Sequence, residues 1–147
     1  MNGVPVDIGA SIRKQVTRFE DLMREATAVE CPVTHHFAQG VYGRELFIPK
    51  GTVLTGKIHK FSQLNILSKG DISVLTETGV KRVQAPFSIV SPPGTKRIAY
   101  AHEDTVWITV HGTYETDVER IEEIFIAQSE EEFVAFCTQQ KLLEHKS

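Results

Sequence analysis

Between residues 31 and 113, apolar and polar positions alternate in short runs, and turn-forming residues separate one run from the next. Alternation with a period of two, bounded by Gly, Pro and Asp, is typical of β-strands. Short strands at close spacing, with no helical stretch among them, predict an all-β antiparallel sandwich or barrel. The expected strands are residues 33–37, 41–48, 52–59, 64–67, 72–76, 80–84, 88–90, 97–101 and 105–113.

Both ends of the chain follow a helical period instead. Ser11 is a suitable N-cap, and the apolar residues that follow it at helical spacing continue to Ala26. This amphipathic helix needs a surface to cover, and we expect that surface to be the barrel or an oligomer seam. Past residue 113, the pattern predicts a short acidic helix over 116–123 and an edge strand over 124–126.

These patterns predict one domain built in three parts. A lead-in and amphipathic helix occupy residues 1–30, a β-barrel occupies 31–126 and a C-terminal helix occupies 127–147. The last helix begins at a capping box formed by Ser129 and Glu132.

Composition narrows the partners that the protein is expected to have. A net charge of −3 gives no electrostatic reason to expect a nucleic acid polymer or an anionic membrane. No apolar run approaches the roughly 20 residues of a membrane span, and the first residues lack the pattern of a signal peptide. Cys31 and Cys137 lie far apart without metal-binding spacing. We therefore expect a cytoplasmic protein with two reduced thiols.

Residues 51–70 place polar side chains where a barrel interior would be apolar. Lys57 and His59 lie two apart, so they share a face of the expected strand, and Gln63 and Gly70 follow. This spacing resembles the first motif of the cupin superfamily: Gly, five residues, His-x-His, three or four residues, Glu, six residues, Gly. Lys57 stands where that motif has its first His, and Gln63 where it has Glu.

A second stretch resembles the other cupin motif, which runs Gly, five residues, Pro-x-Gly, two residues, His. Pro92 and Gly94 match it, whereas Pro86 replaces the leading Gly and Arg97 replaces the His. The resemblance implies a single jelly-roll (cupin) barrel, flanked by the N-terminal helix and one or two C-terminal helices. The runs HHFAQGVYGRELFIPKG and SPPGTKRIAYAHEDTVWITVHGT also resemble small cupin-like proteins of tailed bacteriophages, which would place the protein in a host cytoplasm.

The substitutions argue against the metal that the cupin motifs hold. Lys57 and Arg97 add fixed positive charge, and Gln63 removes the neutralising carboxylate. We therefore expect no metal and no other cofactor. The rival hypothesis is an unconventional metal site in which His59 and Gln63 recruit His111.

The same residues suit an anion. Lys57, His59 and Arg97 would offer directional donors, and arginine binds carboxylate or phosphate through two parallel hydrogen bonds. Gln63 can donate and accept, which suits a sugar or a base edge. The predicted ligand is an anionic metabolite such as a nucleotide or sugar phosphate, and sequestration of a host signal is one use that such binding could have.

Other residues add to this site or compete with it. Trp107 and His111 share one face of the strand over 105–113, as Tyr42 and Arg44 do on theirs, and one such face should look into the barrel. Glu45 is a further candidate, either at the ligand or in an ion pair with Lys57. The alternatives for Arg97 and His111 are structural, as a partner of backbone carbonyls and as a core or dimer-seam histidine. Adjacent His35 and His36 point to opposite faces and cannot chelate together.

Three classes of function stay open. The first is the binding protein just described, and the second is a metal-free isomerase, epimerase or lyase with His59 as general base and Lys57 or Arg97 stabilising an enolate. The third is a phage structural or accessory protein without a ligand. We favour binding because Gln63 removes the carboxylate that would orient the base. A homodimer is expected, with the N-terminal helix and residues 33–37 as its seam.

Overall fold

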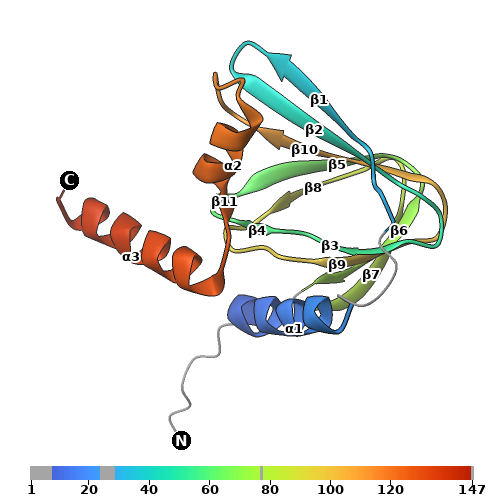
Figure 1. The fold of residues 1–147 in the computed structure, drawn as a ribbon, viewed down its shortest axis with the longest axis horizontal. Helices are drawn as coiled ribbons and strands as arrows, with labels where there is room; N and C mark the ends of the chain where they lie inside the picture. The colour runs from blue at the N-terminus through green and yellow to red at the C-terminus, as the bar shows by residue number, and fades with distance from the viewer. Residues whose placement is uncertain (1–7, 24–28, 77, 147) are drawn as a thin grey trace, which may run out of the picture.

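The computed structural model describes residues 8–23, 29–76 and 78–146, and its longer strands form two antiparallel sheets that face each other (Figure 1). The five-stranded sheet has the order β1 (Val33–Ala38), β2 (Val41–Ile48), β10 (Thr105–His111), β5 (Gln63–Lys69), β8 (Phe87–Ser91). The four-stranded sheet has the order β3 (Val53–Thr55), β9 (Ile98–Ala101), β6 (Asp71–Thr76), β7 (Gly79–Gln84). A two-stranded sheet pairs β4 (Ile58–His59) with β11 (Ile126–Ala127).

The protein is mostly β, and the chain crosses repeatedly from one large sheet to the other. It crosses between β2 and β3, returns through β4 to β5, and crosses again between β5 and β6, β7 and β8, β8 and β9, and β9 and β10, which is consistent with a jelly roll. The predicted barrel is found in part: the antiparallel sheets are present, but no backbone ladder joins the edge strands of the two large sheets in the part of the chain that is described. The fold is therefore a sandwich of separate sheets.

The strand predicted over residues 52–59 is in fact two strands, β3 and β4. The chain leaves the four-stranded sheet at Gly56, whose N–H still donates to the carbonyl of Arg97 at 2.9 Å. Beyond this point β4 pairs with β11, and the N–H of Lys60 donates to Phe125 at 2.8 Å. The predicted strand is therefore interrupted because its second part pairs with β11, which lies near the C-terminal end of the sequence.

Gly70 makes the tight connection from β5 to β6. Its φ of +104° lies in the left-handed region, and a Cβ there would sit 2.7 Å from the carbonyl oxygen of Asp104. Glycine therefore lets the chain turn between the sheets at a point where Asp104 and Thr105, at the start of β10, pack closely against it.

The apolar core lies at one end of the sandwich. The sheets converge there and diverge at the other end, where α2 stands (Figure 1). The buried core residues come from both sheets: Ile48, Leu67, Ile72, Val74 and Ala101. The opposite end of the space between the sheets is left for polar side chains.

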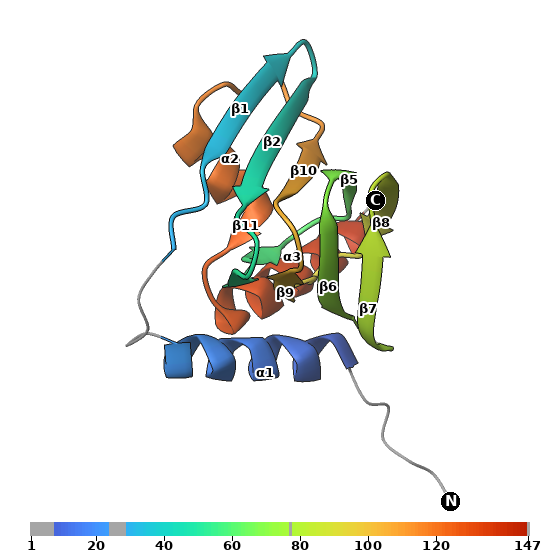
Figure 2. The same ribbon diagram turned by 90° about the vertical axis from the view of Figure 1, so that its right-hand side faces the viewer.

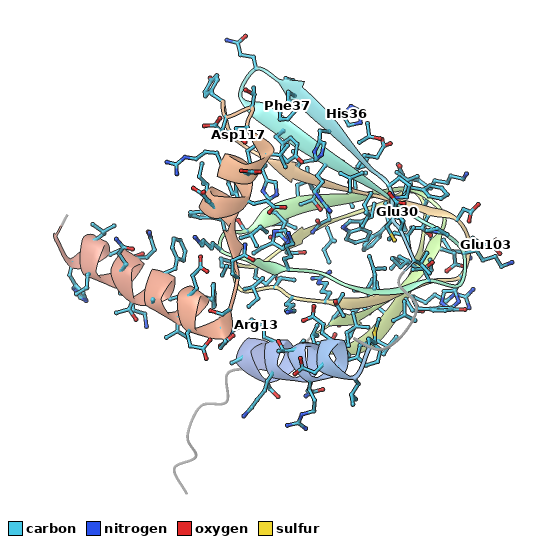
Figure 3. The ribbon with its side chains drawn as sticks, viewed as in Figure 1. Arg13, Glu30, His36, Phe37, Glu103 and Asp117 are labelled. Atoms are coloured by element: carbon cyan, nitrogen blue, oxygen red, sulfur yellow. The ribbon has the colours of Figure 1, made fainter. Side chains whose placement is uncertain are left out.

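Helix α1 (Ile8–Met23) lies along the outside of the four-stranded sheet (Figure 2). It begins before Ser11, so Ser11 is inside the helix rather than its N-cap, and the predicted end at Ala26 lies outside the described residues. Buried Arg13 anchors the helix where it meets the start of α3 (Figure 3). The Arg13 guanidinium donates to the carboxylate of Glu130 at 2.7 and 3.0 Å and to the carbonyl of Gly94 at 3.0 Å.

Helices α2 (Val118–Phe125) and α3 (Glu130–Lys146) follow the strands. The predicted short helix starts two residues late, because the Asp117 side chain caps it by accepting from the N–H of Glu119 at 3.0 Å. The capping box is confirmed in part: Ser129 Oγ accepts from the N–H of Glu132 at 3.1 Å. None of the described helices is long and apolar enough to cross a membrane.

Candidate functional site

A cavity of about 570 Å³ lies between the two large sheets, and α2 contributes to its wall. This volume is in the usual range for small-molecule sites. Its polar and titratable lining residues are Cys31, His35, Tyr42, Arg44, Thr55, Lys57, His59, Gln63, Asn65, Ser91, Thr95, Arg97, Thr109, His111 and Glu122. Its apolar lining comes partly from the two sheets where they converge and partly from Val118, Ile121, Phe125 and Ile126, on or next to α2.

The register of the five-stranded sheet arranges these side chains in rows across the strands. The first row, farthest from the core, pairs Tyr42 with His111, and Gln63 with Ser91 on the neighbouring strands. The second row contains His35, Arg44, Thr109 and Asn65. The third row is apolar and contains Val33, Leu46, Trp107 and Leu67. Polarity therefore falls from row to row toward the core.

The charges that line the cavity are mostly positive. Arg44, Lys57 and Arg97 face a single carboxylate, that of Glu122, among the described lining residues. Lys57 Nζ lies 3.0 Å from Glu122 on α2, so this carboxylate is engaged by the lysine. Arg44, on the five-stranded sheet, has no ion-pair partner among the described residues, and Arg97 stands directly before β9 on the opposite sheet.

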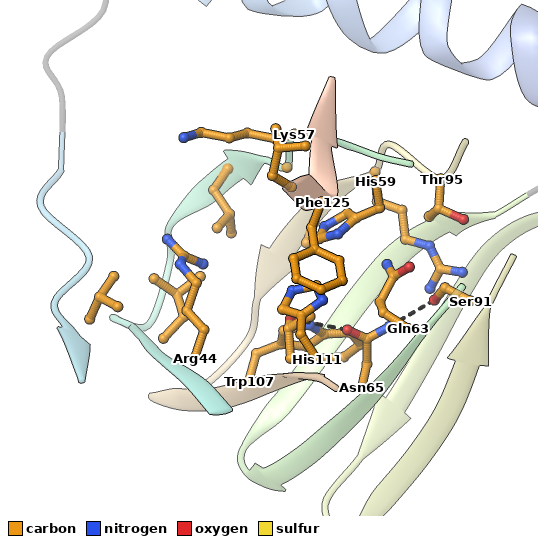
Figure 4. A pocket seen from close by; sticks show the side chains of 18 of the residues that line it. Arg44, Lys57, His59, Gln63, Asn65, Ser91, Thr95, Trp107, His111 and Phe125 are labelled. Carbon is orange, nitrogen blue, oxygen red and sulfur yellow. Dashed lines mark hydrogen bonds between the residues drawn. The ribbon is translucent and has the colours of Figure 1, made fainter. Parts of the chain in front are cut away.

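Two histidines stack in the middle of the cavity. The ring centroids of His59 and His111 are 5.8 Å apart, and Phe125 lies 4.5 Å from His111 (Figure 4). Burial lowers the pKa of His59 to about 4, helped by His111 and by the positive charges of Arg44, Arg97 and Lys57. Burial and Arg44 lower the pKa of His111 to about 4 as well. Both rings are therefore neutral at pH 7.

Some polar side chains of the cavity wall are hydrogen-bonded to one another, whereas others have buried atoms without a hydrogen-bond partner in the described structure. Asn65 Nδ2 donates to Ser91 Oγ at 2.8 Å, and Thr109 Oγ1 donates to Asn65 Oδ1 at 3.1 Å, so this amide is satisfied. In contrast, His59 Nδ1 and Gln63 Oε1 are buried without a hydrogen-bond partner in the described structure. Because such atoms are normally paired, they mark the place where a ligand or water would bind.

Most of the residues predicted from sequence do meet in this cavity. Its lining includes Lys57, His59, Gln63, Arg97, Trp107 and His111. Glu45 does not line it: the Glu45 carboxylate lies 3.4 Å from His36 Nε2. Lys57 accordingly pairs with Glu122 and not with Glu45, and Lys57 is exposed at the cavity mouth rather than fully inside.

The predicted alternation along the strands is confirmed, and it adds Arg44 to the predicted ligand contacts. Trp107, Thr109 and His111 all line the cavity. His35 also lines it, with Nδ1 2.6 Å from the Tyr42 hydroxyl, while neighbouring His36 contacts Glu45. Arg44 was missed as a ligand contact although it shares a face with Tyr42, and that alternation was the signal that could have identified it.

The residues at the motif positions do not fit the metal site of a cupin. A divalent cation there would meet Lys57, Gln63 and Arg97 in place of two imidazoles and a carboxylate. Within the described part of the chain, no three His, Cys, Asp or Glu side chains come together to hold a metal ion.

No protein-family model matches this sequence, and no curated protein matches it. Among solved structures, a cupin domain from Bordetella pertussis is 15% identical with a TM-score of 0.46, over 59% of this chain and 97% of its own. A cupin-2 domain protein from Shewanella frigidimarina is 13% identical with a TM-score of 0.45, over 69% and 99%. KdgF from Halomonas sp. is 18% identical with a TM-score of 0.49, over 63% and 90%.

At these values the similarities carry no argument about ligand or activity. Two of the three structures are described as cupins, the superfamily whose motif spacing this sequence resembles. The narrower resemblance to bacteriophage proteins stays a prediction. The function must be inferred from the cavity itself.

Proposed function

We propose that this protein is a cupin-type binding protein whose cavity holds a small anionic metabolite. The observation that carries the proposal is the positive charge of Arg44, which lines the cavity and has no ion-pair partner among the described residues. Arg44 and Arg97 line the cavity, and its one described carboxylate, Glu122, is engaged by Lys57. Nucleotides and sugar phosphates meet this charge requirement, and holding one without turnover would sequester it.

An anion stabilises such a cavity through ordinary electrostatics. At 4 Å, a cation and an anion attract each other by about 4 kcal/mol at the effective dielectric constant near a protein surface. Arginine adds geometric selectivity because its planar fork matches carboxylate and phosphate oxygens. Arg44 has no ion-pair partner among the described residues, so its charge is available to a ligand.

The state of His59 favours binding over acid–base catalysis. A general base works best with a pKa near the operating pH, whereas the pKa of His59 is lowered to about 4. Its ring is also stacked on His111 rather than oriented by a carboxylate. A neutral imidazole in this position is suited to hydrogen-bond a ligand and is a weak base.

The proposal is tested by a thermal-shift screen that compares each acid with its neutral amide or ester. We expect the protein to be stabilised by acids and phosphates and not by the neutral analogues. Arg44→Gln and Arg97→Gln should each weaken binding roughly 10- to 100-fold, the loss expected for a hydrogen bond to a charged group. Arg18→Gln, at an exposed site on α1, is the matched control and should bind normally. Equal binding of acids and amides would contradict the proposal.

A further inference from the structure

We infer that the ligand is an organic anion with an apolar body, held with its charged group among the arginines and its body against Trp107. This inference rests on the proposed function of the cavity and specifies which anion it takes. It separates amphiphilic acids from nucleotides and sugar phosphates, which carry polar groups along their whole length.

The first observation is the order of side chains along β2. Arg44, Leu46 and Ile48 occupy successive inward positions, and all three line the cavity. Two residues of a strand span about 7 Å, so apolar surface begins one such step beyond the Arg44 charge. On the neighbouring β10, Thr109 pairs with Arg44 and Trp107 pairs with Leu46, and they repeat the same order.

The opposite sheet independently repeats this order. Arg97 stands immediately before β9, and Ala99 and Ala101 follow at the same two-residue step. Leu54 and Val74 both pair with Ala99 in register and line the cavity with it. Each wall therefore places an arginine next to apolar surface, and the two walls run in the same direction toward the core.

The apolar end excludes a ligand that is polar throughout. Its lining residues are Cys31, Val33, Leu46, Ile48, Leu54, Ile72, Val74, Ala99 and Trp107. Hydroxyl groups of a sugar placed there would leave water for side chains that mostly cannot hydrogen-bond, which weakens binding. An alkyl or aromatic body gains free energy at the same place because it leaves water for an apolar environment.

The polar end of the cavity is suited to the charged group of the ligand. The unpaired Nδ1 of His59 and Oε1 of Gln63 lie in the cavity whose charge comes from Arg44 and Arg97. A carboxylate or phosphate there can bind the arginines, and a donor next to it, such as a hydroxyl or an ordered water, can satisfy Gln63.

The test uses Trp107, which is the only tryptophan of the chain. Its intrinsic fluorescence is titrated with acetate, butyrate, hexanoate, octanoate and phenylacetate, and binding is measured in parallel by calorimetry with a hexose phosphate and adenosine monophosphate. Burial of each methylene is worth about 0.8 kcal/mol, so affinity should rise roughly fourfold per methylene until the apolar end is full. The emission of Trp107 should change with the longer acids and with phenylacetate.

A pair of variants localises the effect. Ala99→Leu fills the apolar end and should weaken octanoate binding at least tenfold while acetate binding stays unchanged. Val90→Leu, at an exposed position on β8, adds apolar volume away from the cavity and should leave both unchanged. If Ala99→Leu does not fold, the chain-length series of the unmodified protein still decides the question.

The outcomes separate this inference from the proposed function. Tighter binding of the hexose phosphate or the nucleotide than of octanoate, or affinity independent of chain length, would overturn the inference and leave anion binding intact. Equal binding of octanoate and octanamide would overturn anion binding itself. Octanoate binding that needs both Arg44 and the open apolar end would support both.

Discussion

Acidification should destabilise this protein well before its carboxylates are protonated, because two buried histidines must take up protons. His59 and His111 have folded-state pKa values lowered to about 4 from 6.5. In the unfolded chain both would titrate near 6.5. Between pH 6.5 and pH 4 the unfolded state therefore binds more protons, so the stability contribution present above pH 6.5 is lost as the pH falls toward 4.

The size of this effect follows from the shift. A difference of about 2.5 pKa units at about 1.4 kcal/mol per unit gives roughly 3 kcal/mol for one histidine. Because His111 itself helps to lower the pKa of His59, the two contributions are coupled, and the loss belongs to the pair rather than to either histidine alone. A total net stability of about 5–15 kcal/mol is usual for a domain, so the loss is a large part of it.

Urea unfolding at pH 7.0 and at pH 4.0, followed by far-ultraviolet circular dichroism, measures this loss. His111→Gln should reduce the difference between the two pH values by about 2–3 kcal/mol. His145→Gln, at an exposed site on α3, should leave the difference unchanged. Hydrogen bonds from Arg82 and Gln84 lower the pKa of Asp71 to about 2, so its contribution is lost only at lower pH.

The pH dependence of the three proteins can also refute this reasoning. If the free energy of unfolding changes equally with pH in the unmodified protein, His111→Gln and the double variant with His59→Gln, the buried neutral histidines do not set the pH dependence. The description of His59 and His111 as buried, neutral side chains of the cavity would then be wrong, since burial is the main cause of both lowered pKa values.

Three further predictions follow from other parts of the molecule. Arg13→Ala should lower the free energy of unfolding by about 2 kcal/mol in urea, because it leaves the buried carbonyl of Gly94 without its donor. Arg18→Ala on the same helix should change it little. Untagged protein should contain well under one metal ion per chain by elemental analysis, and one ion per chain that disappears in His59→Ala would contradict this. Light scattering at micromolar concentration should give a dimer, since edge strand β1 exposes Phe37, and a monomer mass would rule the dimer out.

The cavity walls could be predicted because they depend on local periodicity. Alternation along β10 predicted that Trp107 and His111 share a face of the strand. The structure then shows that this face lines the cavity. The capping box at Ser129 is likewise local, so it located the start of the last helix.

The features that sequence reasoning missed depend on distant partners. The break at Gly56 arises because β4 pairs with β11, far along the chain. Lys57 could pair with Glu45 or Glu122 on charge alone, and only the position of α2 over the cavity decides for Glu122. Arg44 matches no cupin motif position, so the motif comparison drew attention to Arg97 and away from it.

The most direct test of the central claim is a crystal structure of the protein soaked with the tightest-binding acid of the series. Our account predicts electron density between the two sheets, with the anionic oxygens within about 2.7–2.9 Å of the Arg44 or Arg97 guanidinium and the apolar body against Trp107. Density for the acid only on the outer surface, or inside with its charged group at the Trp107 end, would contradict the account.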